Sequence, residues 1–123
     1  MECVAVDDYT TIAYLRSLVD RAEEARQLDQ SPKELTSSMS VEVGGLLDYF
    51  RSKSDEEINA LLCRPESRQA VAHEVADVLY HVLALASSID FDLSAVFRDK
   101  MASSPSRYST RNLHADLQER AAS

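Results

Sequence analysis

Hydrophobic residues recur three and four positions apart over most of the chain, which is the spacing of a buried helical face. This pattern predicts a first helix over residues 8–28. Its apolar stripe comprises Ile12, Leu15, Leu18, Val19 and Ala22. The longest apolar helix is predicted over residues 66–88, with a stripe of Val71, Val75, Val78, Leu79, Val82 and Leu85. We expect this second stripe to form the centre of the core.

Two serine–glutamate pairs mark the starts of further helices. The stretch SPKE at 31–34 combines an N-cap serine, a proline at the first helical position and a glutamate at the third, and it predicts a helix over 32–51. The stretch SDEE at 54–57 repeats the serine–glutamate spacing. It predicts a short helix that ends near Cys63.

A last long helix is predicted from about Asp92, with a buried face of Leu93, Val96, Phe97 and Met101. The pattern weakens beyond Pro105. We therefore predict one helical domain over 1–109 and a C-terminal tail over 110–123, either a short helix or an arm. The expected fold class is all-α, a bundle of four long helices with a short helix between the second and third.

Composition and charge narrow the classes of partner. With 2 Gly and 3 Pro in 123 residues, the chain lacks the turn residues of a β fold. A net charge of -8 would repel a nucleic-acid backbone, so no DNA or RNA partner is expected. Cys3 and Cys63 show no zinc or disulfide spacing, which favours a reducing, cytoplasmic setting. Because the N-terminus lacks a signal peptide and no apolar run approaches about 18 residues, neither export nor a membrane is expected.

Three acidic residues stand among apolar neighbours on the predicted inner helices. Glu74 and Asp77 are three residues apart, so they share one side of their helix, and His81 follows on the same stripe. Glu42 stands between two valines on the preceding long helix. If these two helices pack antiparallel, the three carboxylates converge.

Converging carboxylates repel one another and raise each other's pKa, and a hard divalent cation with oxygen ligands removes that repulsion. Magnesium suits such a site best, with manganese as the alternative ion. A simpler alternative pairs Glu42 with an arginine and leaves Glu74 and Asp77 as a solvated helix edge. Spacing alone leaves both interpretations open.

Three segments occur in an order that is typical of one known family. They are SPKELTSSMSVEVGGLLDYF at 31–50, EVADVLYHVLALASSIDFDL at 74–93, and Lys100 with Arg107 and Tyr108. Together they resemble the MazG-like family of all-α nucleoside triphosphate pyrophosphohydrolases, over about residues 28–108. In that family an ExxE motif and a following ExxD motif supply four acids that hold magnesium around a nucleoside triphosphate.

The resemblance implies a reaction and a set of site residues. The reaction is the house-cleaning hydrolysis of a ribo- or deoxyribonucleoside triphosphate to the monophosphate and pyrophosphate. The implied catalytic and metal-binding residues are Glu42, Glu74 and Asp77. The implied nucleotide contacts are Lys100, Arg107 and Tyr108 for the triphosphate, with Phe50, Tyr80 and His81 for the base. Each has a simpler alternative as a core residue or a surface charge. Members of the family assemble as homodimers or homotetramers, with the site near the subunit junction.

The chain departs from the family pattern at several positions. Gly45 stands where the family has the second Glu of ExxE, and Gly44 stands where a small residue allows close helix packing or ligand approach. Asp48 does not replace the missing acid, because six residues rotate it by about 120° from Glu42. The other departures are His81 in place of Tyr, Ser103 and Ser104 in place of Lys-Asn, and Ser109 in place of Pro.

The missing acid leaves alternative functions open. One is a catalytically impaired MazG-like relative that binds a nucleotide or a protein partner. The other is a purely structural helical oligomer.

Overall fold

The computed structural model of the chain describes residues 6–103, 118 and 121, and the regular structure in this part is helical throughout. Its elements are η1 (Val6–Asp8), α1 (Ile12–Ala25), α2 (Pro32–Asp48), α3 (Asp55–Cys63), α4 (Pro65–Ile89) and α5 (Leu93–Ser103). The predicted all-α fold class, with a short helix between the second and third long helices, is confirmed.

The chain divides into two compact units, residues 1–90 and residues 91–123. The first unit holds η1 and α1 to α4, and the second holds α5. The predicted boundary at 109 remains a prediction, since residues 104–117 lie outside the described part. In the predicted tail over 110–123, only Gln118 and Ala121 are described, and both are helical.

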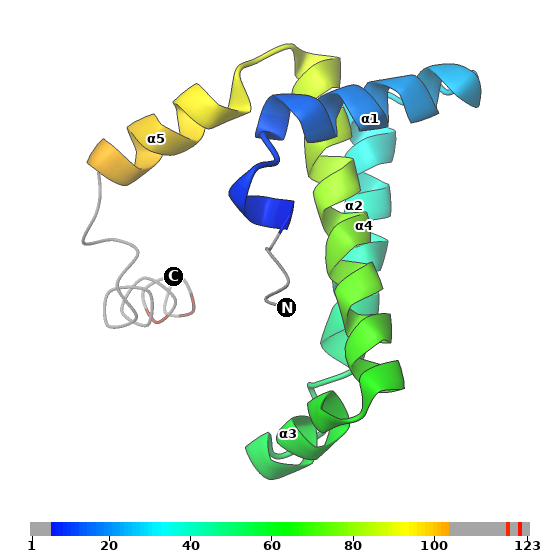
Figure 1. Cartoon of the computed structure of the whole chain (residues 1–123), viewed down its shortest axis with the longest axis vertical. Coiled ribbons are helices and arrows are strands. Elements are labelled where there is room, and N and C mark those ends of the chain that lie inside the picture. The colour runs from blue at the N-terminus through cyan, green and yellow to red at the C-terminus, as the bar shows by residue number, and fades with distance from the viewer. Residues whose placement is uncertain (1–5, 104–117, 119–120, 122–123) are drawn as a thin grey trace. The chain divides into compact units, whose positions relative to one another are not determined.

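In the first unit, α2 and α4 lie side by side and run in opposite directions (Figure 1). The short α3 and its tight connections reverse the chain between them. The α1 helix packs near the C-terminal end of α4, and α3 packs near its N-terminal end (Figure 1). The antiparallel pairing required for the three acids to converge is therefore present.

Both predicted capping boxes are formed. In α2 the backbone N–H of Glu34 donates to Ser31 Oγ over 3.2 Å, and the N–H of Ser31 donates to the Glu34 carboxylate over 3.3 Å. In α3 the same reciprocal pair joins Ser54 and Glu57. Each box satisfies two backbone donors that a helix start would otherwise leave without partners. The starts of α2 and α3 are thus determined locally.

The start of α1 differs from the prediction. The helix begins at Ile12 instead of Asp8, because the Tyr14 backbone N–H donates to the Thr11 hydroxyl over 3.1 Å and Thr11 caps the helix. Asp8 belongs to the preceding 3-10 turn. A threonine can cap a helix N-terminus as a serine does, so Thr11 is the residue in the sequence that marks the start of α1.

The end of α1 also comes earlier than predicted. Gln27 adopts a left-handed conformation with φ of 55°, and the Leu28 N–H donates to the Glu23 carbonyl over 2.9 Å. This is a Schellman-type ending, which satisfies the last carbonyls of the helix. The helix therefore stops at Ala25.

The core is concentrated where α1, α2 and α4 meet. The buried apolar residues are Val19, Leu35, Leu83, Ala84 and Ala86. Polar contacts join the same elements, since Arg16 Nε donates to Ser87 Oγ over 2.8 Å and Arg16 Nη2 donates to the Ala86 carbonyl over 3.1 Å. The α1 helix therefore covers the core near the C-terminal end of α4.

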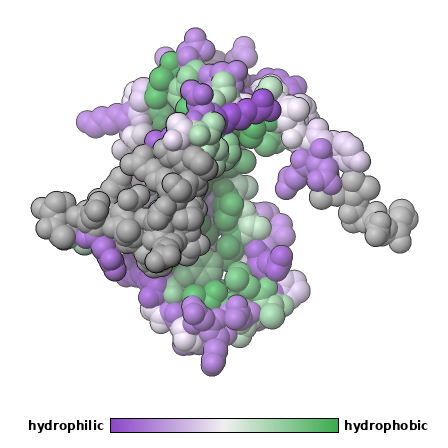
Figure 2. Space-filling view, turned by 90° about the vertical axis from the view of Figure 1, so that its left-hand side faces the viewer, coloured by the Kyte–Doolittle hydropathy of each residue, from purple (hydrophilic) through white to green (hydrophobic). Residues whose placement is uncertain are grey.

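Part of the predicted apolar stripe lies on the surface. Val75 is 51% exposed and Leu79 is 38% exposed, so the prediction that they are core residues is wrong for this chain alone. The α1 helix covers α4 only near its C-terminal end, and α2 and α3 leave one side of the earlier turns open. In the second unit, Val96 and Phe97 of α5 are also exposed, against prediction. Figure 2 shows hydrophobic surface in green on one face of the molecule, next to hydrophilic residues in purple.

By length and composition alone, α4 could cross a membrane, with a mean hydropathy of 1.2 over 18 residues. The core helix of a water-soluble bundle passes the same test. Any 18-residue stretch of α4 contains both Glu74 and Asp77, and one Asp at the centre of a bilayer costs about 2.5–3.5 kcal/mol. These acids and the contacts of α4 with α1, α2 and α3 fit a bundle helix.

Candidate functional site

Carboxylates from two helices meet along the α2–α4 contact. One oxygen each of Glu42, Glu74 and Asp77 can be chosen so that all three lie within 4.8 Å of one another. Glu42 and Glu74 are half-buried, and Asp77 is exposed. Among the described residues, no other group of three or more His, Cys, Asp or Glu side chains is gathered in this way.

The simpler alternative for these acids paired Glu42 with an arginine, and the structure does not show that pair among the residues it describes. Within residues 6–103 no lysine or arginine forms an ion pair with the three acids, and the pair that does form joins Arg51 to Asp48 at 3.6 Å. Glu42 instead shares a side-chain hydrogen bond with Glu74. The exposure of Asp77 agrees with a solvated helix edge, but its carboxylate still belongs to the cluster.

The crowding of negative charge changes the acidity of the cluster. The hydrogen bond with Glu42 raises the pKa of Glu74 above its usual value of 4.5, and desolvation and the charges of Glu42 and Asp77 raise it further. A hydrogen bond between two carboxyl groups requires that one of them hold a proton. The metal-free cluster therefore binds a proton more readily than an isolated glutamate does.

We predict that Glu42→Gln lowers the pKa of Glu74 toward 4.5, because the variant removes the main cause of the increase. A raised pKa favours the protonated folded state, so the metal-free native chain loses stability as pH rises from 4.5 through the raised pKa. In Glu42→Gln this loss should shrink. Side-chain carboxyl NMR titration measures the pKa directly, and an unchanged Glu74 pKa would contradict the hydrogen bond.

Gly45 faces the same cluster. A Cβ atom built at this position would lie 3.6 Å from Glu74 Oε2 and 3.9 Å from Glu74 Cδ, which is ordinary van der Waals contact. Glu42 and Gly45 are three residues apart on α2, as Glu74 and Asp77 are on α4. The Cβ of a side chain at position 45 would thus fit beside Glu74 without forcing the backbone to move.

Gly44 behaves differently. A Cβ built there would meet no heavy atom within 4 Å among the described residues. The expectation that a small residue at this position allows close helix packing is therefore not met within this part of the chain. Its other expected use, ligand approach, stays a prediction.

His81 lies one turn after Asp77 on α4 and is half-buried. Its Nδ1 lies 2.7 Å from the Asp77 carbonyl oxygen. Because a carbonyl only accepts, Nδ1 carries the proton and donates, which leaves Nε2 of a neutral ring as an acceptor. The Tyr80 ring packs edge-on against His81 with centroids 5.5 Å apart. The proposed base contact of His81 stays a prediction.

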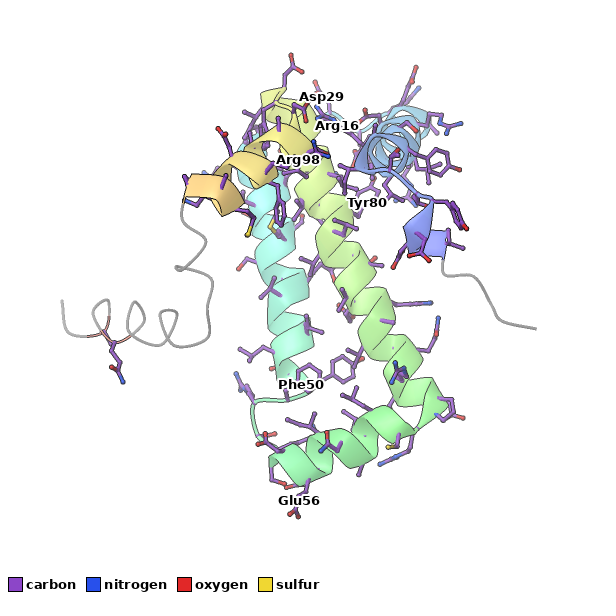
Figure 3. All side chains as sticks on the ribbon, turned by 60° about the vertical axis from the view of Figure 1, so that its left-hand side comes forward. Arg16, Asp29, Phe50, Glu56, Tyr80 and Arg98 are labelled. Carbon is purple, nitrogen blue, oxygen red and sulfur yellow. The ribbon has the colours of Figure 1, made fainter. Side chains whose placement is uncertain are left out.

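Tyr80 makes a contact that its sequence position did not reveal. Its hydroxyl donates to Glu23 Oε1 on α1 over 2.7 Å, and Gln30 Nε2 donates to the same carboxylate over 3.1 Å. The tyrosine thus joins α4 to α1 (Figure 3). Burial, followed by the hydrogen bond and charge of Glu23, raises the pKa of Tyr80 to about 12.

We predict that Tyr80→Phe lowers the free energy of unfolding by about 1.5 kcal/mol, because a hydrogen bond to a charged acceptor is lost. The tyrosine's pKa rises from 10.0 to about 12, so its stabilising contribution is complete below pH 10 and is lost as pH rises through 12. Urea unfolding at neutral and alkaline pH measures both effects. Tyr14→Phe is the matched control, since Tyr14 is 54% exposed, and an equal loss in both variants would contradict the prediction.

A cavity of about 550 Å³ lies where α1, the following loop, α2 and α4 meet. Its acidic lining residues are Asp20, Glu23, Glu24 and Asp29, over an apolar floor that includes Leu35 and Ala84. The sequence did not predict it, because its walls come from separate elements. Four carboxylates without a basic lining residue would repel a triphosphate. This cavity therefore does not suit the phosphates.

The remaining predicted nucleotide contacts are spread over the chain. Phe50 is half-buried just beyond α2, with its ring centroid 6.3 Å from that of Tyr49, and Figure 3 places it near the α3 end of the first unit. Lys100 is exposed in the last turn of α5, in the second unit. Arg107 and Tyr108 lie outside the described residues, as do Ser104 and Ser109. The nucleotide contacts of all these residues stay predictions.

A family model described as phosphoribosyl-ATP pyrophosphohydrolase matches residues 18–104, which include α2, α3, α4 and the carboxylate cluster. The chain is also 35% identical over 77 residues to proteins named dCTP pyrophosphatase 1 from Rattus norvegicus and Mus musculus. The Homo sapiens protein of the same name is 34% identical over 77 residues. The matched stretch is 63% of this chain and 45% of each of these relatives, so the chain spans less than half of their length.

Proposed function

Because the chain belongs to the phosphoribosyl-ATP pyrophosphohydrolase family of MazG-like, all-α nucleotide pyrophosphohydrolases, we propose that it hydrolyses a nucleoside triphosphate to the monophosphate and pyrophosphate. The family resemblance inferred from the sequence is thereby confirmed. The observation that carries the proposed activity is the convergence of Glu42, Glu74 and Asp77 inside the matched region. The relatives' name makes dCTP the first substrate to test.

The donor set fits a hard divalent cation. Three carboxylates with oxygens within 4.8 Å of one another supply the ligand type that magnesium and manganese take. The raised pKa of Glu74 also supports cation binding. Without a metal, a proton offsets part of the negative charge of the cluster, and a bound cation would neutralise the same charge. When bound, such an ion supplies Lewis-acid polarisation of the phosphate oxygens.

The chain's own residues supply the remaining chemistry. In its ionised form, the Glu42 or Glu74 carboxylate can accept a proton from a water molecule as that water attacks phosphorus. The bond between that phosphorus and the oxygen bridging the α and β phosphates breaks, and the products are the monophosphate and pyrophosphate. Lys100 and Arg107 would neutralise phosphate charge, with Tyr108 as a further contact. Phe50 and His81 would hold the base.

Gly45 favours a second candidate function. The cluster has three acids where the family pattern has four, and the position of the missing one faces Glu74. A catalytically impaired relative would bind a nucleotide, or a protein partner, without turning the nucleotide over. Fewer metal ligands would weaken both metal binding and orientation of the attacking water.

Pyrophosphate release from dCTP and a panel of other nucleotides, with magnesium or manganese, tests the proposal. Active protein should yield dCMP and pyrophosphate in equal amounts and no free phosphate. Absence of turnover, with a melting temperature that rises when a nucleotide and metal are added, would support the impaired relative instead. Absence of both turnover and thermal stabilisation would contradict both candidate functions.

We also propose that the chain works as a homodimer or homotetramer in the cytoplasm. Exposed apolar side chains on α2 and α4 support an assembly, for example Val41 at 72%, Leu47 at 52% and Val75 at 51% exposure. Light scattering gives the mass in solution, and a monomer at micromolar concentration would contradict the assembly.

A further inference from the structure

The carboxylate cluster has four helical positions that point toward one another, and only three carry acids. Glu74 and Asp77 supply both positions on α4, whereas α2 supplies Glu42 and Gly45. The Cβ position of residue 45 lies 3.6 Å from Glu74 Oε2. Gly45 therefore leaves a gap in the ligand set.

We propose that Gly45 limits this chain to one protein-bound divalent ion, and that a second ion arrives with the triphosphate. This inference rests on the proposed function, and it concerns how many ions the protein itself holds. It makes residue 45 the position that determines metal stoichiometry.

Ligand geometry supports a single ion. Magnesium–oxygen distances are about 2.0–2.1 Å, so opposite ligands of one ion lie about 4.2 Å apart. The three carboxylate oxygens lie within 4.8 Å of one another, and small side-chain rotations of Glu42, Glu74 and Asp77 would bring them onto one ion. Their incomplete burial leaves room for these rotations.

The charge balance of the cluster also supports one protein-bound ion. One divalent ion leaves the three carboxylates with a residual negative charge, whereas two ions about 4 Å apart would exceed their charge and repel each other. A triphosphate carries several negative charges of its own, so it can bring a further ion with it. A fourth carboxylate at position 45 would balance two ions on the protein alone.

Neighbouring residues on α2 do not fill the gap. Asp48 is exposed and pairs with Arg51 at 3.6 Å. Tyr49, at the end of the helix, packs near Phe50 with ring centroids 6.3 Å apart. Asp48 does not belong to the group of acids that gathers around Glu74.

Counting bound Mn²⁺ in the nucleotide-free protein tests the proposal, by calorimetry and by electron paramagnetic resonance, which detects coupling between adjacent ions. The native chain should bind one ion. Gly45→Glu should bind two, with the spectrum of a coupled pair. Gly45→Gln has the same shape without the charge and should stay at one, as should Gly44→Glu, whose side chain starts away from the cluster.

A further measurement on the native chain does not depend on any variant folding. A non-hydrolysable dCTP analogue should raise the count from one Mn²⁺ to two. Two ions on the nucleotide-free native chain, or one ion on folded Gly45→Glu, would overturn the inference. So would a count that stays at one when the analogue binds with manganese in excess.

The outcomes separate this inference from the proposed function. One bound ion without turnover of any nucleotide would reject the proposed activity and keep the stoichiometry. Two bound ions together with dCTP hydrolysis would reject the stoichiometry and keep the proposed activity. A native chain that binds no Mn²⁺ at millimolar concentration would reject both.

Discussion

Under the proposed function, Glu74→Gln should lower the kcat/KM for dCTP on the order of a hundredfold or more, because the substitution would remove both a metal ligand and a proton acceptor. Glu74 is the acid that contacts both Glu42 and the position of Gly45, so no other described carboxylate occupies its place. The amide has nearly the same shape as the acid, and it removes one of three crowded charges. The metal-free variant should therefore fold as well as the native chain.

The control for this prediction is Glu56→Gln, since Glu56 is an exposed residue in the first turn of α3 (Figure 3). It makes the same chemical change and should leave kcat/KM within about twofold, because a surface charge far from the site contributes little. Steady-state kinetics with dCTP compares the two variants at saturating magnesium. Equal activity of Glu74→Gln and the native chain would contradict the proposed catalytic role of the cluster.

Leu83→Ala should lower the free energy of unfolding by about 2–5 kcal/mol, the cost of removing a large core side chain. Leu83 is 2% exposed on α4, in the part of the helix that α1 helps to cover. Because few residues are fully buried in the part of the chain that the structure describes, neighbouring side chains there have little means to refill the cavity. Urea unfolding followed by circular dichroism measures the loss.

Leu79→Ala is the matched control, because Leu79 lies one turn earlier on the same helix and is 38% exposed. Its loss should be clearly smaller, since removing a partly solvated side chain leaves no closed cavity. An equal loss for the two leucines at dilute protein concentration would show that the early turns of α4 are covered in solution, and it would contradict the burial difference seen in the single chain.

Local sequence signals predicted most of the helical architecture. Ser31 and Ser54, each with a glutamate three residues later, indicated the starts of α2 and α3, because a capping box needs only a few consecutive residues. The start and end of α1 were missed because the signals were weaker. Thr11 is a less common cap, and Gln27 is not a residue from which a left-handed ending is expected.

From residue spacing alone, candidate site chemistry was predictable only within single helices. Three-residue spacing indicated that Glu74 shares a side with Asp77, but it could not show that Tyr80 reaches Glu23, 57 residues earlier in the chain. The exposure of Val75 was not predicted, for a related reason. Periodicity identifies an apolar face, while burial depends on whether another helix covers it.

By itself the sequence determined the helices, most of their limits and the acids available on each face, because backbone hydrogen bonding and capping act over a few neighbouring residues. Tertiary structure alone decided that Glu42 meets Glu74 and Asp77 and that position 45 opens onto them. Those contacts depend on the antiparallel packing of α2 on α4, in which residues about 30 positions apart come together. No local pattern encodes which residues will face each other across that contact.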